Sequence, residues 1–155
     1  MFDGVPQGPL LFLAAGVGGV QLLDVSDPTR PEALGSPIPV HARRIILGGT
    51  IALAIGPDGV AVLDISDPRS PALAGWYRTG WAEDAALDGR LACVAEGPRG
   101  LTVLDLSDPR RPRVVSACPE VYAGGVAVDG GYAFVADSTG LTAVRLLIPT
   151  WLLRQ

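Results

Sequence analysis

The sequence VAVLDISDPRSP at residues 60–71 joins an apolar run to an abrupt polar stop. The chain repeats this pattern, because VQLLDVSDPTRP begins at Val20 and LTVLDLSDPRRP begins at Leu101. The apolar run is typical of a β-strand, and the Ser-Asp-Pro that follows it is typical of a turn. A strand and a turn that recur in this way indicate a fold assembled from similar units.

The aspartates that close the apolar runs, Asp24, Asp64 and Asp105, are 40 and 41 residues apart. A further step of 40 reaches Arg145, which indicates a fourth copy that has lost its acidic residues. The opening FDGVPQGPLLFLAAG matches AGGVAVDGGYAFVAD of the fourth copy without a gap, and the extra residue of the third copy falls in its turn AEGPRG. We expect one domain over 1–155, with repeats at about 1–38, 39–78, 79–119 and 120–155.

The composition is that of a folded protein without a basic surface. Hydrophobic residues make up 48% of the chain, which argues against disorder, and a net charge of −4 gives no reason to expect nucleic acid as a partner. The start of the chain lacks the basic region of a signal peptide, and no apolar run approaches the roughly 18 residues of a membrane helix. We expect no membrane insertion, and either a cytoplasmic location or a place in a longer exported chain.

Each repeat contains four short segments rich in β-forming residues and bounded by Gly, Pro or Asp. In the second repeat they are ARRIIL, IALAI, VAVLDI and ALAGWY, and the last repeat ends in the less regular TWLLRQ. Four-stranded units at a period of about 40 residues are typical of a β-propeller, in which radial stacking covers both faces of each sheet. We therefore predict an all-β fold, a β-propeller built from four repeats, each a four-stranded antiparallel blade.

The pattern GLxVLDxSDPxxPxxxG, followed by a strand such as YAFVAD, resembles the LVIVD-type repeat of bacterial and archaeal proteins. The resemblance covers nearly the whole chain, with three strong copies and a degraded last one. It implies propeller blades whose first strand lines a central channel and whose fourth strand lies at the rim. It implies no catalytic motif, because the family shares none.

The recurring D-x-S-D-P motif has two interpretations. Its oxygens suit calcium, but the spacing is too short for an EF-hand loop, whose glycine and distal glutamate are missing. A structural turn is favoured instead, because Asp and Ser side chains accept hydrogen bonds from nearby backbone N–H groups and Pro presets φ. We expect no metal here, and structural roles for Asp24, Ser26, Asp27, Asp64, Ser66, Asp67, Asp105, Ser107 and Asp108.

One set of polar and aromatic residues recurs just before each predicted inner strand, where it would ring one mouth of the channel. These residues could bind a small polar ligand or a peptide; alternatively, the aromatic rings plug the mouth and the charges pair between blades. With a single histidine in the chain, a multi-histidine metal site is excluded. The candidate binding residues are His41, Arg43, Arg44, Trp81, Glu83, Asp84 and Tyr122, with Met1 in the same column.

Two classes of function fit this sequence. The first is a non-catalytic scaffold that binds a protein or a ligand and needs no cofactor. The second is an enzyme, possessing a lyase-like or lactonase-like site at the channel mouth. A metal-dependent enzyme would need several converging carboxylates, for which the sequence offers Asp3, Glu83 and Asp84.

The repeat also predicts which residues occupy equivalent core positions. One column contains Leu13, Leu53, Cys93 and Phe134, and a second contains Leu23, Leu63, Leu104 and Val144. Cys93 is expected to be a buried thiol rather than half of a disulfide with Cys118, because the two lie on different predicted elements.

The assembly stays open at this point. Two copies with four blades each could close an eight-bladed ring about a two-fold axis, a single chain could close alone, or the sequence could be part of a longer propeller. In the first case the apolar residues of the degraded repeat would lie near the seam; otherwise they are free to drift. They are Ile148, Trp151, Leu152 and Leu153.

Overall fold

The computed structural model describes residues 2–80 and 82–147, and these residues form an all-β β-propeller fold without a helix. Fifteen strands make four separate antiparallel sheets, in which each strand pairs with the next along the chain. Blade 1 contains β1 (Asp3–Gln7), β2 (Leu10–Ala14), β3 (Val20–Asp24) and β4 (Glu32–Ile38); blade 2 contains β5 (Arg44–Gly48), β6 (Ile51–Gly56), β7 (Gly59–Asp64) and β8 (Ala72–Arg78). Blade 3 contains β9 (Asp84–Asp88), β10 (Leu91–Ala95), β11 (Leu101–Asp105) and β12 (Arg113–Cys118), and blade 4 contains β13 (Gly125–Asp129), β14 (Tyr132–Ala136) and β15 (Leu141–Arg145).

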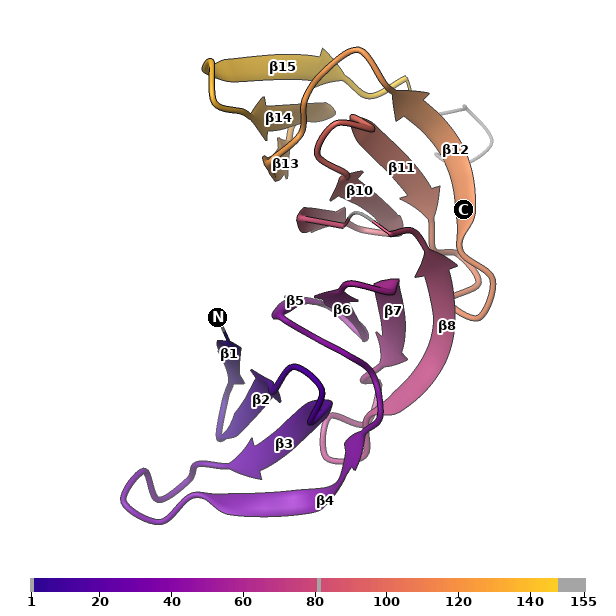
Figure 1. The fold of residues 1–155 in the computed structure, drawn as a ribbon. Coiled ribbons are helices and arrows are strands. Elements are labelled where there is room, and N and C mark those ends of the chain that lie inside the picture. The colour runs from indigo at the N-terminus through magenta and orange to yellow at the C-terminus, as the bar shows by residue number, and fades with distance from the viewer. Residues whose placement is uncertain (1, 81, 148–155) are drawn as a thin grey trace.

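The four blades lie along an open arc, with blade 1 and blade 4 at its two ends (Figure 1). The first strands of the blades line the concave side and contact one another in the order β1, β5, β9, β13. The fourth strands β4, β8 and β12 lie on the convex side, so the expected order from channel to rim is confirmed. The expected last strand TWLLRQ lies outside the described residues.

The core is divided into three apolar clusters, one between each pair of successive blades. Blade 2 is covered on both faces, so that Leu53 and Leu63, on opposite faces, are both fully buried. Among the described residues, no blade precedes blade 1, and Leu23 on its outer face is therefore only half-buried. Val144 of blade 4 is also half-buried, but it packs against the cluster between blades 3 and 4. Stacking of blades, rather than closure of each sheet on itself, supplies the apolar burial that stabilises the fold.

One of the two predicted core columns is correct and the other is wrong in blade 1. Leu23, Leu63, Leu104 and Val144 occupy the same place in their sheets, each one residue before the end of the third strand. In the other column, however, the residue equivalent to Leu53 is Phe12 rather than Leu13, because Phe12 pairs with Leu22 as Leu53 pairs with Val62. A shift of one residue moves a side chain to the opposite face of a sheet. Leu13 consequently lies on the open face of blade 1.

The sequence alignment pairs Leu13, rather than Phe12, with Leu53 because the connection between the second and third strands differs in length between blades. Five residues join these strands in blades 1 and 3, whereas four join Ile55 to Val60 in blade 2. In blades 1 and 3 the longer connection forms an isolated bridge to the next blade, Gly16 to Ala42 and Gly97 to Ala123. The extra residue is therefore present in the first copy as well as in the third.

The structural repeat is consequently a pair of blades. Blades 1 and 2 map onto blades 3 and 4 by a constant shift of 81 positions, without an insertion or deletion between equivalent strands. The shift takes Asp3 to Asp84, Leu10 to Leu91, Arg44 to Gly125 and Asp64 to Arg145.

The D-x-S-D-P segments form tight turns in which the aspartates accept backbone hydrogen bonds. The Oδ1 atom of Asp24 accepts the N–H of Ser26 at 2.9 Å, and the same contact is 2.8 Å long at Asp64 and at Asp105. The second aspartate of each motif, Asp27, Asp67 or Asp108, accepts the N–H two residues further on at 2.9–3.1 Å. The carboxylates thus hold the turn that redirects the chain toward the rim.

The turns also connect neighbouring blades. The Nη2 atom of Arg69, in the turn of blade 2, lies 3.0 Å from Oδ2 of Asp24 in blade 1. Arg110 of blade 3 likewise lowers the pKa of Asp64 in blade 2, after the larger effect of the Ser66 hydrogen bonds. Hydrogen bonds from Ser26, together with Arg69, lower the pKa of Asp24 to about 2. The turns of blades 2 and 3 therefore each place an arginine near an aspartate of the preceding blade.

Replacing Leu53 by Ala is expected to lower the free energy of unfolding by about 2–5 kcal/mol, because the change leaves a cavity between blades 2 and 3. Leu73→Ala is the control, since Leu73 is 41% exposed on β8 and its truncation should cost much less. Urea unfolding of both variants measures the difference. Equal unfolding midpoints would contradict the packing described.

Stability is expected to fall at acid pH in a way that depends on Asp24. The folded-state pKa of about 2 lies below the ordinary value of 3.8, so the ionised carboxylate stabilises the fold above about pH 4, and this contribution is lost as the pH falls to about 2. Melting temperatures between pH 2 and 6 should decline less steeply in Asp24→Asn than in the wild type. Asp58→Asn, in an exposed turn outside the motif, is the control and should follow the wild type.

Candidate functional site

The starts of the inner strands of the first three blades, which lie on the concave side of the arc (Figure 1), contribute residues to a hollow of about 400 Å³. Its volume is within the range of ligand pockets, roughly 300–1,000 Å³. The hollow brings together Arg43, Arg44 and Glu83 of the predicted set and adds a carboxylate from the start of β1. The residues of this inner hollow are Phe2, Asp3, Arg43, Arg44, Ile55 and Glu83.

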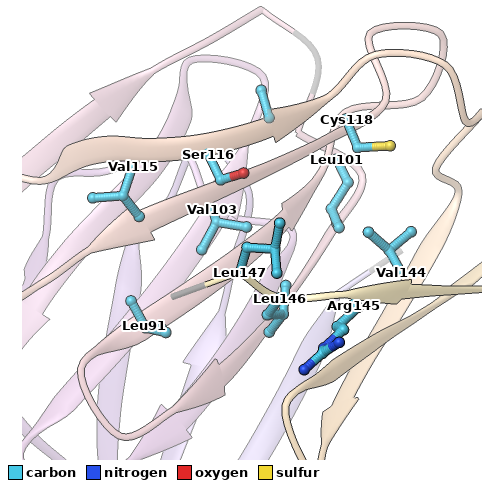
Figure 2. A pocket seen from close by; sticks show the side chains of 11 residues that line it. Leu91, Leu101, Val103, Val115, Ser116, Cys118, Val144, Arg145, Leu146 and Leu147 are labelled. Carbon is cyan, nitrogen blue, oxygen red and sulfur yellow. The ribbon is translucent and has the colours of Figure 1, made fainter. Parts of the chain in front are cut away.

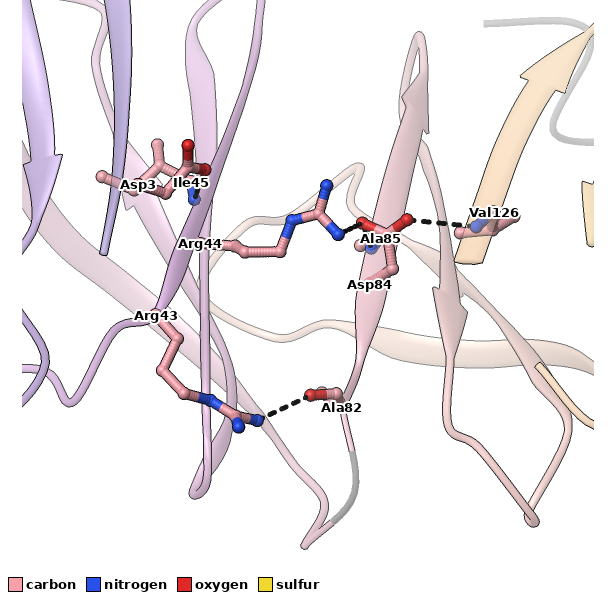
Figure 3. A network of polar contacts seen from close by, with 8 residues as sticks. All are labelled: Asp3, Arg43, Arg44, Ile45, Ala82, Asp84, Ala85 and Val126. Carbon is pink, nitrogen blue, oxygen red and sulfur yellow. Dashed lines mark hydrogen bonds and ion pairs between the residues drawn. The ribbon is translucent and has the colours of Figure 1, made fainter. Parts of the chain in front are cut away.

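Asp84 is the polar centre of this region, and its carboxylate joins three blades (Figure 3). One oxygen, Oδ1, lies 3.1 Å from Nη1 of Arg44 in blade 2 and also accepts the N–H of Ala85 at 2.9 Å. The other, Oδ2, accepts the N–H of Val126 in blade 4 at 3.1 Å. The side chain of Asp84 is largely buried, and a buried charge is tolerated when it is paired and hydrogen-bonded in this way. Asp84 therefore connects blades 2, 3 and 4.

Asp3 of blade 1 makes the contact with blade 2 that Asp84 of blade 3 makes with blade 4. Its Oδ2 atom accepts the N–H of Ile45 at 3.1 Å, so the start of β1 is fixed to β5. The sequence signal for this role is the shift of 81 positions between Asp3 and Asp84, which the 40-residue alignment missed.

The two arginines differ in how they are held. Arg44 is fixed by Asp84, although about half of its side chain stays exposed. Arg43 is exposed, and its guanidinium donates to the carbonyl oxygen of Ala82 at 3.5 Å. Glu83 is also exposed, while its backbone N–H donates to the carbonyl oxygen of Ala95 at 2.9 Å. The inner hollow thus presents Arg44, which is paired with Asp84, beside the exposed side chains of Arg43 and Glu83.

The described residues do not form the predicted circle of aromatic side chains around the channel mouth. Tyr122 is 51% exposed and does not line the inner hollow. His41 is partly buried, and its carbonyl oxygen lies against Gly56, where an added Cβ would approach it to 1.7 Å. Trp81 and Met1 lie outside the described residues. The charged members of the predicted set therefore come together, whereas Tyr122 and His41 do not line the hollow with them.

A buried carboxylate that the sequence analysis did not single out lies between blades 2 and 3. Glu96 is 4% exposed, and its Oε2 atom accepts the hydroxyl of Thr102 at 2.5 Å. The hydroxyl of Tyr77, on the rim strand of blade 2, lies 3.3 Å from Oε1, and burial raises the pKa of Tyr77. These contacts fix the longer connection of blade 3 to blade 2. A glutamate in a glycine-rich turn gives no sequence signal of burial.

Two other hollows differ in character from the inner one. One of about 660 Å³ lies at the opposite end of the inner strands of blades 2 and 3, where the D-x-S-D-P turns and the hairpin glycines line it. Figure 2 shows an apolar pocket between β12 and β15. Its volume of about 30 Å³ is far below that of a ligand site.

Both cysteines are free thiols. Cys93 is buried between blades 3 and 4. Its burial raises the pKa of the thiol to about 11, and the nearby charge of Asp88 makes a smaller contribution in the same direction. The thiol of Cys93 is therefore protonated at neutral pH and packs as a small apolar group.

No group of three or more His, Cys, Asp or Glu side chains among residues 2–80 and 82–147 has the arrangement of a metal site. Of the three carboxylates that the enzyme alternative offered, Asp3 and Asp84 accept backbone hydrogen bonds and Glu83 is exposed. Within the part of the chain that the structure describes, no helix is long and apolar enough to cross a membrane.

The LVIVD repeat model matches residues 45–79, 80–119 and 122–144, which together make up more than half of the chain. The chain therefore belongs to the LVIVD-repeat family, and the resemblance seen in the sequence is confirmed. No curated protein sequence matches the chain.

Solved structures match the fold at low sequence identity. The computationally designed protein Ika4 has a TM-score of 0.69 and 10% identity over 93% of this chain and 89% of its own, and the designed protein Ika8 has the same TM-score and identity over 93% of this chain and 45% of its own. A chain from a Saccharomyces cerevisiae complex of Dbp5 with Nup159 and Gle1 has a TM-score of 0.55 and 8% identity over 85% of this chain and 37% of its own. At such identities these likenesses describe the fold alone.

Proposed function

We propose that the protein is a non-catalytic scaffold whose inner hollow binds a peptide or a small polar ligand. The ligand carries an acidic group, which the arginines of the hollow recognise. The observation that carries this proposal is the pair Arg43 and Arg44 at the mouth of a hollow large enough for a ligand. Glu83 on the same rim favours a ligand that also carries a positive charge.

The different contacts of Arg43 and Arg44 support the binding of an acidic group. Asp84 already neutralises Arg44 and holds its guanidinium in place, so Arg44 forms a fixed wall of the hollow. Arg43 keeps an exposed guanidinium whose long contact to a carbonyl does not neutralise its charge. A guanidinium binds a carboxylate with two parallel hydrogen bonds, which gives both affinity and orientation.

Selection from a displayed library of random peptides tests this proposal. The expected result is enrichment of peptides with an acidic residue, whose binding by calorimetry weakens at least about tenfold in Arg43→Glu, because a charge-assisted contact becomes a repulsion. Arg111→Glu is the matched control, since Arg111 is an exposed arginine of the blade 3 turn, away from the hollow. Melting temperatures of both variants should equal that of the wild type.

Two outcomes would contradict the proposal. If the selected peptides lacked acidic residues, recognition of an acidic group by Arg43 would be contradicted. Equal loss of binding in Arg43→Glu and Arg111→Glu would show that overall charge, rather than the inner hollow, governs binding.

A further inference from the structure

Blades 1 and 4 lie at the two ends of the arc (Figure 1), and among the described residues no neighbouring blade covers their outer faces. Apolar side chains lie on both of these faces. On blade 1 the open face includes Leu13, which is half-buried. On blade 4 it includes Phe134, which is also half-buried, and Leu141, which is 70% exposed. Contiguous apolar faces of this kind are uncommon on monomeric proteins and indicate an interaction surface.

The internal repeat indicates that these two faces could pack on each other. Since the structural unit is a pair of blades, the contact of blade 2 with blade 3 is the template for a contact of blade 4 with a following blade 1. Most residues of the core between blades 2 and 3 correspond to apolar residues on the two open faces, so the two faces can form a continuous core. In blade 4, Phe134, Leu141 and Ala143 take the places of Leu53, Val60 and Val62; in blade 1, Leu11, Leu13 and Leu23 take those of Ala92, Val94 and Leu104.

The residues at the charged-pair positions of the two ends are compatible as well. Within the chain, an aspartate of one blade faces an arginine in the turn of the next, as Asp24 faces Arg69 at 3.0 Å. At the ends, blade 4 has Arg145 at the aspartate position and blade 1 has Thr29 at the arginine position. An arginine at position 29 would face Arg145, whereas the neutral Thr29 avoids this repulsion.

From these observations we infer that the open faces are the two halves of an interface with a second copy of this chain. Blade 4 of each copy packs on blade 1 of the other, so a two-fold axis relates two identical seams and a ring of eight blades closes. This inference does not depend on what the inner hollow binds.

Light scattering at micromolar concentration is the first test, and the expected mass is twice the 16.0 kDa of one chain. A mass of one chain would overturn the inference, and so would a mass above two chains, because closure at eight blades allows no third copy.

Charge exchange across the seam tests the geometry. Thr29→Arg is expected to raise the dimer dissociation constant roughly tenfold or more, because two arginines then face each other. Thr29 is exposed and its equivalents are Arg69 and Arg110, so the turn accepts arginine and the variant keeps its fold. Adding Arg145→Asp to Thr29→Arg recreates the template pair and should restore dimerisation.

Thr29→Arg with unchanged dimerisation, or the double variant dimerising no better than Thr29→Arg alone, would overturn the proposed seam. Leu13→Asp, on the open face of blade 1, should yield a folded protein with the mass of one chain. Circular dichroism checks that this variant folds, and a folded Leu13→Asp dimer would also contradict the inference.

Discussion

The structure depends on one constraint, which is that a four-stranded sheet with two apolar faces must be covered on both sides. The repeats meet it by stacking, so each internal blade buries side chains such as Leu53 toward one neighbour and Leu63 toward the other. The apolar effect is non-directional and does not by itself fix the angle or register between blades. Polar contacts between successive blades supply that direction.

The polar contacts are of two kinds and lie at opposite ends of the inner strands. At one end Asp3 and Asp84 accept backbone N–H groups of the following blade. At the other end the D-x-S-D-P turns place an arginine such as Arg69 against an aspartate of the preceding blade. Because Asp84 also fixes Arg44, the contact that sets the blade geometry shapes the inner hollow too. The proposed binding surface thus includes Arg44, which Asp84 holds in the contact between blades 2 and 3.

The same constraint links the ends of the arc to assembly. Internal blades are covered by their sequence neighbours, whereas among the described residues no blade covers the outer face of blade 1 or of blade 4. In the proposed dimer, blade 1 of one copy would cover blade 4 of the other, and Thr29 and Arg145 would meet at the positions of the usual charged pair. In an eight-bladed ring the two inner hollows would face one channel, which the assembly would close.

The sequence by itself determined the all-β propeller, the number of repeats and the order of strands from channel to rim, because these follow from apolar periodicity and turn chemistry that each repeat carries locally. It did not determine the register of blade 1, where Phe12 rather than Leu13 faces blade 2, since one extra turn residue leaves the apolar pattern LLFL unchanged. Only the tertiary structure separated the roles of neighbouring charges, placing Asp84 inside the blade contacts and leaving Arg43 at the hollow. Burial and partners of a charge are set by chain segments about 40 residues away, which no local pattern encodes.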